Sequence, residues 1–112
     1  MPNKKKIRSN FRNVCLKRDK YACVMCGKKS GSPKEVLIIF DVHHIFDRSK
    51  MPNGGYCLEN GITLCHDCHL KAEQFHSTGT AHPEYAPDDL YKKINSSYEK
   101  AVAASEKLKA IF

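Results

Sequence analysis

The chain has 112 residues, of which 41% are hydrophobic and none is tryptophan. This length predicts one domain over residues 1–112, with a modest core, because small domains leave much of their surface exposed. No apolar run approaches a membrane span, and the N-terminus lacks the apolar stretch of a secretory signal. The composition therefore excludes a membrane protein, and we expect a soluble, cytoplasmic one.

The charge is unevenly distributed along the chain. The formal net charge is +7, and residues 1–34 carry 11 of the 19 Lys and Arg residues but one of the 12 acids. A basic N-terminal region favours a polyanionic partner, most simply nucleic acid. For the run Lys4 to Lys6, a solvated tail is an equally good interpretation.

The predicted elements follow in chain order. A basic arm (1–8) precedes a short helix (9–19), in which Phe11, Val14, Cys15 and Arg18 recur at helical spacing. A cysteine-bearing turn then leads to a β-rich stretch (35–45) that is typical of a strand. After a loop with Pro and Gly residues come a second strand (61–64) and a helix (67–75).

The C-terminal segment, about residues 88–112, predicts one long amphipathic helix. Its apolar stripe has the 3-4 spacing of a helix-pairing seam: Tyr91, Ile94, Tyr98, Ala101, Ser105, Leu108 and Phe112. A homodimer through this helix is one interpretation. The alternative is that the stripe packs on its own domain.

Four of the six cysteines form two Cys-x2-Cys pairs, Cys23 with Cys26 and Cys65 with Cys68. Nothing indicates secretion, so this spacing favours metal over disulfides. Four thiolates complete the tetrahedral shell of a structural Zn²⁺, which would stabilise a small core. Of the remaining two, Cys15 is predicted to be a core residue and Cys57 to be inert.

Histidines adjoin these ligands. His69 follows Cys68 at a predicted helix start, where neighbouring side chains diverge by about 100° around the axis. His43 and His44 end a predicted strand, and successive strand side chains point to opposite faces. We therefore expect a second metal site that joins His69 to one residue of the His-His pair, leaving the other free to act as a base.

These motifs together resemble a known family. Cys-Val-Met-Cys-Gly (23–27), Asp-Val-His-His-Ile (41–45), Glu-Asn-Gly-Ile-Thr-Leu-Cys (59–65) and Cys-His (68–69) resemble the HNH endonucleases, in particular the subgroup with four zinc-binding cysteines. The similarity spans about residues 9–76. It implies an α+β fold, a small ββα-metal (His-Me finger) domain with zinc-stapled turns, here flanked by N- and C-terminal helices.

The resemblance also implies roles for single residues. His43 and His69 would hold a catalytic divalent ion (Mg²⁺, Mn²⁺, Ni²⁺, Co²⁺ or Zn²⁺), His44 would be the general base, and Asn60 would support the site. Sites of this family often have a further side-chain ligand. Glu73, four residues after His69, and Asp41, two before His43, are the candidates, and a solvent-facing carboxylate is the alternative for each.

The resulting hypothesis is a metal-dependent DNA endonuclease, nicking or cutting both strands, that leaves 5′-phosphate and 3′-hydroxyl ends. Its family implies a bacterial or phage origin. The alternative is a non-catalytic zinc module that binds nucleic acid, which would need none of the histidines. The residues predicted to contact DNA phosphates are Arg18, Lys28, Lys29, Arg48 and Lys50.

Overall fold

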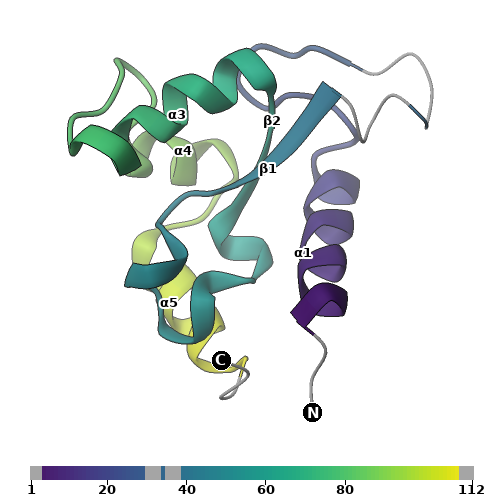
Figure 1. Ribbon diagram of the computed structural model, residues 1–112, viewed down its shortest axis with the longest axis vertical. Coiled ribbons are helices and arrows are strands. Elements are labelled where there is room, and N and C mark those ends of the chain that lie inside the picture. The colour runs from purple at the N-terminus through teal and green to yellow at the C-terminus, as the bar shows by residue number, and fades with distance from the viewer. Residues whose placement is uncertain (1–3, 30–33, 35–38, 109–112) are drawn as a thin grey trace.

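The computed structural model describes residues 4–29, 34 and 39–108 (Figure 1). Its helices and strands are α1 (Lys4–Arg18), β1 (Phe40–His44), β2 (Gly61–Cys65), α3 (His66–Thr78), α4 (Pro87–Lys93) and α5 (Tyr98–Glu106). Short 3-10 helices lie between the strands: η1 (Arg48–Lys50), η2 (Pro52–Gly55) and η3 (Leu58–Asn60). None of the described helices is long and apolar enough to cross a bilayer.

The two strands form an antiparallel sheet in which Phe40 pairs with Cys65 and His44 with Gly61. α3 follows β2 directly, and α1 and α3 lie on different sides of the strand pair (Figure 1). Every residue of β2 is buried, because elements cover both of its faces. This is an α+β fold with the ββα order of a small metal-binding domain, as the sequence predicted.

The first helix begins earlier than predicted. Residues 4–8, which we expected to form an arm, are helical and continue into α1. The helix buries Phe11, Cys15 and Leu16. It can lie close to β2 because Gly61 has no side chain, and a Cβ there would sit 2.5 Å from the Cys15 Sγ atom. The prediction of Cys15 as a core residue is confirmed.

The predicted strand over 35–45 is described from Phe40 onward, since residues 35–38 lie outside the described residues. The second strand and the helix after it are confirmed, with α3 reaching Thr78 rather than residue 75. α3 ends where Gly79 adopts a left-handed φ of 79°, a conformation that glycine tolerates without steric cost.

The prediction of one continuous C-terminal helix was wrong. The chain leaves α4 after Lys93, Asn95 takes a φ of 56°, and Ser97 caps α5 by accepting a hydrogen bond from the backbone N–H of Lys100. The left-handed backbone of Asn95 and the capping hydrogen bond of Ser97 end one helix and begin another, although the apolar residues continue at helical spacing.

This break also changes the interpretation of the apolar stripe. Tyr91, Ala101 and Ser105 are buried in the chain's own fold, where the Ser105 hydroxyl accepts a hydrogen bond from the Gly55 backbone N–H. Tyr98 stays exposed, and Phe112 lies outside the described residues. Self-association through this segment stays a prediction.

Candidate functional site

The four cysteines of the two Cys-x2-Cys pairs converge. Their Sγ atoms all lie within 4.8 Å of one another, and those of Cys26 and Cys65 are 3.7 Å apart. Zn–S bonds of about 2.3 Å in a tetrahedron place sulfurs roughly 3.8 Å apart, so the cluster has the size of a Zn-thiolate site. None of the six cysteines forms a disulfide in this structure.

The first cysteine pair sits on a tight turn attached to the sheet. The backbone N–H of Gly27, whose φ is 81°, donates to the Cys23 carbonyl at 2.8 Å. The N–H of Val24 donates to the carbonyl of Thr63 in β2. The second pair, Cys65 and Cys68, spans the junction of β2 with α3. A bound ion would therefore join three separate parts of the fold.

The electrostatics of the cluster fit a cation. Burial raises the pKa of the Cys68 thiol to about 12, although the Tyr85 hydroxyl donates a hydrogen bond to its Sγ at 3.3 Å. Burial also acts on Cys23, but backbone N–H donors around its sulfur bring its pKa down to about 7. Four thiolates can coexist in this partly buried space only with a positive charge among them, which Zn²⁺ supplies.

A second ligand cluster lies on the other side of the start of α3. His43 of β1 and His69 and Glu73 of α3 place one ligand atom each within 4.8 Å of the others. Glu73 Oε1 is 3.1 Å from His69 Nε2 and 3.5 Å from His43 Nδ1. Of the two carboxylates that the sequence left open, Glu73 is the one that completes this cluster.

His43 fits a metal-ligand role. It is 2% exposed, and neither ring nitrogen makes a hydrogen bond among the described residues. Burial, with His69 nearby, lowers its pKa to about 2, so the imidazole stays neutral as metal binding requires. Two imidazoles and a carboxylate suit divalent transition metals, and the residues present therefore fit the divalent ion that the sequence analysis predicted.

Asp41 has a different position. Its Oδ2 lies 3.0 Å from His69 Nδ1 and 2.7 Å from His66 Nδ1. A carboxylate on Nδ1 fixes the tautomer of His69 so that Nε2 is free for a metal, the usual arrangement around histidine ligands. Asp41 thus orients the His69 ring, and His66, for which no role was predicted, shares its carboxylate.

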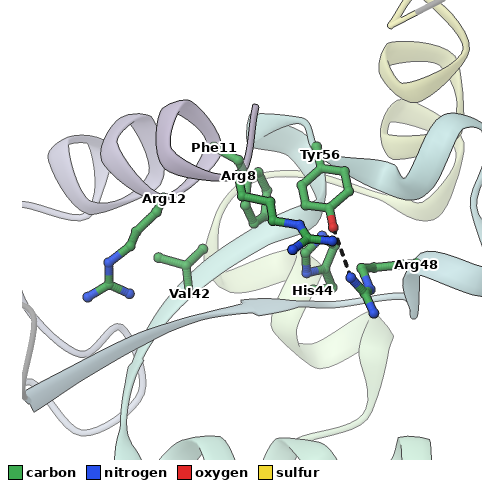
Figure 2. Close-up of a pocket in the computed structure, with 7 residues that line it drawn as sticks. All are labelled: Arg8, Phe11, Arg12, Val42, His44, Arg48 and Tyr56. Atoms are coloured by element: carbon green, nitrogen blue, oxygen red, sulfur yellow. Dashed lines mark hydrogen bonds between the residues drawn. The ribbon is translucent and has the colours of Figure 1, made fainter. Parts of the chain in front are cut away.

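His44 points away from this cluster, as strand alternation predicts, into a pocket against α1 (Figure 2). Its ring stacks on Phe11 with centroids 4.6 Å apart and meets Tyr56 edge-on at 4.8 Å. Nε2 is buried without a hydrogen bond among the described residues. Burial, and then the positive charge of Arg48, lower its pKa to about 4. His44 is therefore a neutral imidazole at pH 7.

His76 was not among the site residues predicted from the sequence. Its Nε2 lies 2.9 Å from the His44 carbonyl oxygen, and its ring stacks on that of His43 at 4.9 Å. It therefore contacts the backbone of one predicted functional histidine and the ring of the other. Its position seven residues after His69, on the same face of α3, is the signal that could have found it.

Asn60 is fully buried and uses its whole amide. Its Nδ2 donates to the carbonyls of Phe46 and Gly55 at 3.1 and 3.3 Å. Its Oδ1 accepts from the Phe46 backbone N–H at 3.1 Å and from the Tyr91 hydroxyl at 2.8 Å. These bonds fix the backbone two residues beyond His44, which is a positioning role.

The five predicted phosphate contacts separate into two kinds. The Arg18 guanidinium makes two hydrogen bonds to Asp19 and donates to the carbonyls of Leu58 and Gly61, so its donors are used within the fold. The others are exposed: Lys28, Lys29, Arg48 and Lys50. Arg48 lines the His44 pocket, together with Arg8 and Arg12, which the sequence analysis did not single out.

The strand pair, the helix after it and the four-cysteine cluster define a small ββα-metal domain. Residues 23–75 match the family model of the HNH endonuclease, which confirms the motif-based resemblance over that segment. α1, α4 and α5 lie outside the matched residues. Comparison with curated proteins and with solved structures gives no significant match.

Proposed function

We propose that this protein is a metal-dependent DNA endonuclease that hydrolyses a phosphodiester to 5′-phosphate and 3′-hydroxyl ends. The observation that carries the proposal is the arrangement at the end of β1. One histidine of the adjacent pair joins His69 and Glu73 in a metal-ligand cluster, while the ring of the other lines a cationic pocket on the opposite side of the strand.

In this proposal His44 is the general base. A neutral imidazole can accept a proton from water, and the His44 ring lines the cationic pocket from which a water would approach. Its pKa of about 4 makes it a weak base in the free protein. An incoming phosphate brings negative charge, which stabilises the imidazolium and moves the pKa toward neutrality.

His43, His69 and Glu73 would hold the divalent ion, and Asp41 and His76 would orient the histidines. A bound ion supplies Lewis-acid stabilisation of charge on the phosphate and on the leaving oxygen. Asn60 transfers no proton, because its amide is committed to backbone groups and to Tyr91. Its contribution is to hold the segment that follows His44.

The test is cleavage of supercoiled plasmid and of end-labelled duplex by the zinc-loaded chain, with Mg²⁺, Mn²⁺, Ni²⁺ or Co²⁺ and an EDTA control. We expect nicked or linear product and 3′-hydroxyl ends that a polymerase extends. His44→Ala should slow cleavage by about 100- to 10,000-fold, the usual contribution of a general base, while zinc content, melting temperature and DNA binding stay unchanged. DNA binding without cleavage in every metal would leave the non-catalytic zinc module as the better reading.

A further inference from the structure

A cationic groove runs between α1 and the segment after β1. It consists of two adjoining cavities of about 340 and 510 Å³, which share Arg8, Arg48 and Tyr56. His44 lines the first cavity (Figure 2). The 3-10 helix η1 borders the second. The groove therefore connects the predicted base to a longer surface along the helix.

One face of α1 supplies the basic wall of this groove. Lys4 lines one cavity, Arg12 the other, and Arg8 both. Residues four apart rise about 6 Å along a helix and share a face, so these cations form a line rather than a point. The buried residues Phe11 and Cys15 fix the rotation of the helix. The line of charge is thus held in place by the core.

Among the described residues that line the two cavities, the acid is Asp47, whose carboxylate accepts hydrogen bonds from the backbone and side chain of Ser49. Arg8 makes no hydrogen bond or ion pair within the part of the chain that the structure describes. Arg12 donates to the Phe40 carbonyl at 2.9 Å, and Arg48 donates to the Tyr56 hydroxyl at 3.1 Å. The Phe40 carbonyl and the Tyr56 hydroxyl are uncharged, and each contact helps to position its guanidinium group.

Such an arrangement costs stability. Converging like charges repel, and cations near the N-terminal end of a helix oppose its dipole. A bound polyanion would offset this repulsion. A linear array of cations beside a catalytic base is suited to a backbone of regularly spaced phosphates rather than to one small anion.

We propose that this groove binds the sugar–phosphate backbone of one DNA strand, with Lys4, Arg8 and Arg12 contacting phosphates along it and Arg48 contacting a phosphate close to His44. The inference rests on the proposed function for the identity of the strand. α1 lies outside the residues that match the HNH model, so one wall of this groove comes from a helix beyond the matched segment.

The test compares Arg8→Ala with Lys17→Ala, which removes an exposed cation from the same helix outside both cavities. Neither substitution should unfold the protein, because Ala favours a helix and Arg8 has no intramolecular polar partner among the described residues. Binding of a fluorescent duplex to the zinc-loaded chain is measured by anisotropy over a range of salt concentrations, without a catalytic ion so that the duplex stays intact.

We expect the slope of log affinity against log salt to decrease by about 0.9 for Arg8→Ala, the value for one lost phosphate contact, and by less than half of that for Lys17→Ala. Equal slopes for the two variants would refute the proposal that this groove binds DNA. Cleavage is scored separately. If the wild type cuts DNA but the slopes are equal, the proposed DNA-binding groove is wrong and the proposed endonuclease activity is supported. If the wild type does not cut DNA in any metal but the slopes differ, the groove binds DNA and the proposed endonuclease activity is wrong.

Discussion

Replacing Asn60 by Asp should destabilise the fold by about 4 kcal/mol at neutral pH. The change keeps the size of the side chain but exchanges two N–H donors for a carboxylate oxygen. That oxygen would face the carbonyls of Phe46 and Gly55, at the 3.1 and 3.3 Å that now separate them from Nδ2. Asn60 is 0% exposed, so water cannot compensate.

The magnitude follows from the bonds that are lost. Each buried carbonyl left without a donor costs about 1–3 kcal/mol, which gives roughly 2–6 kcal/mol for two, before any cost of a buried charge. Against a typical stability of about 5–15 kcal/mol, this is a large fraction. The loss of stability caused by Asn60→Asp should be smaller in mild acid, because a protonated Asp side chain regains one hydrogen-bond donor.

Asn53 provides a matched control. Its Nδ2 also donates to two carbonyls, those of Ser105 and Glu106 at 3.2 and 3.4 Å, but the side chain is partly exposed. Asn53→Asp should therefore cost about 1 kcal/mol, the net value of a hydrogen bond that water can replace.

The assay is urea unfolding of the zinc-loaded proteins, followed by circular dichroism and analysed for the free energy of unfolding. If Asn60→Asp lies within 1 kcal/mol of the wild type, or no further from it than Asn53→Asp, the amide does not fix this loop, and the positioning role of Asn60 is refuted.

Two further predictions use neighbouring residues. Cys68→Ser should lose zinc and most of the fold, because metal binding is coupled to folding in small domains. His69→Ala should keep one tightly bound zinc and a near-native melting temperature but lose cleavage. Equal loss of zinc from both variants, measured by metal analysis, would mean that the two clusters form one merged site. His44 takes up a proton near pH 6.5 when unfolded but only near pH 4 when folded, so its contribution to stability is complete above pH 6.5 and is lost as the pH falls toward 4. Between pH 6.5 and pH 4 the free energy of unfolding of the wild type should therefore fall by about 3 kcal/mol more than that of His44→Asn. The measurement is urea unfolding at each pH. Parallel curves of this free energy against pH for the two proteins would contradict the buried, neutral state of His44.

The sequence predicted the parts of the site that depend on local periodicity. Cys68 and His69 are adjacent in the chain but belong to different clusters, because a helix turns by about 100° per residue. His43 and His44 separate for the corresponding reason in a strand. Adjacent residues are informative here because each of these two pairs lies within one regular element, α3 or β1.

The parts that the sequence did not predict depend on contacts between distant elements. Glu73 and Asp41 were equivalent as sequence candidates, and only the packing of β1 against α3 places one in the cluster and the other behind His69. Arg18 looked like an exposed cation until its contacts with Asp19 and with the β2 region were visible. The break at Asn95 follows from turn chemistry that helical periodicity does not register.

The two clusters are linked mechanically through α3. The cysteine cluster includes the residue immediately before α3, Cys65, and one in its first turn, Cys68, so a zinc ion there fixes the position and rotation of the helix start. The same helix carries His69, Glu73 and His76, so its position and rotation also set theirs. A domain with so small a core has few other means of holding ligands to the precision that catalysis requires. We infer that a zinc ion in the cysteine cluster would act as the rigid support of the proposed catalytic site, which would explain why residues of both clusters lie within a single short motif.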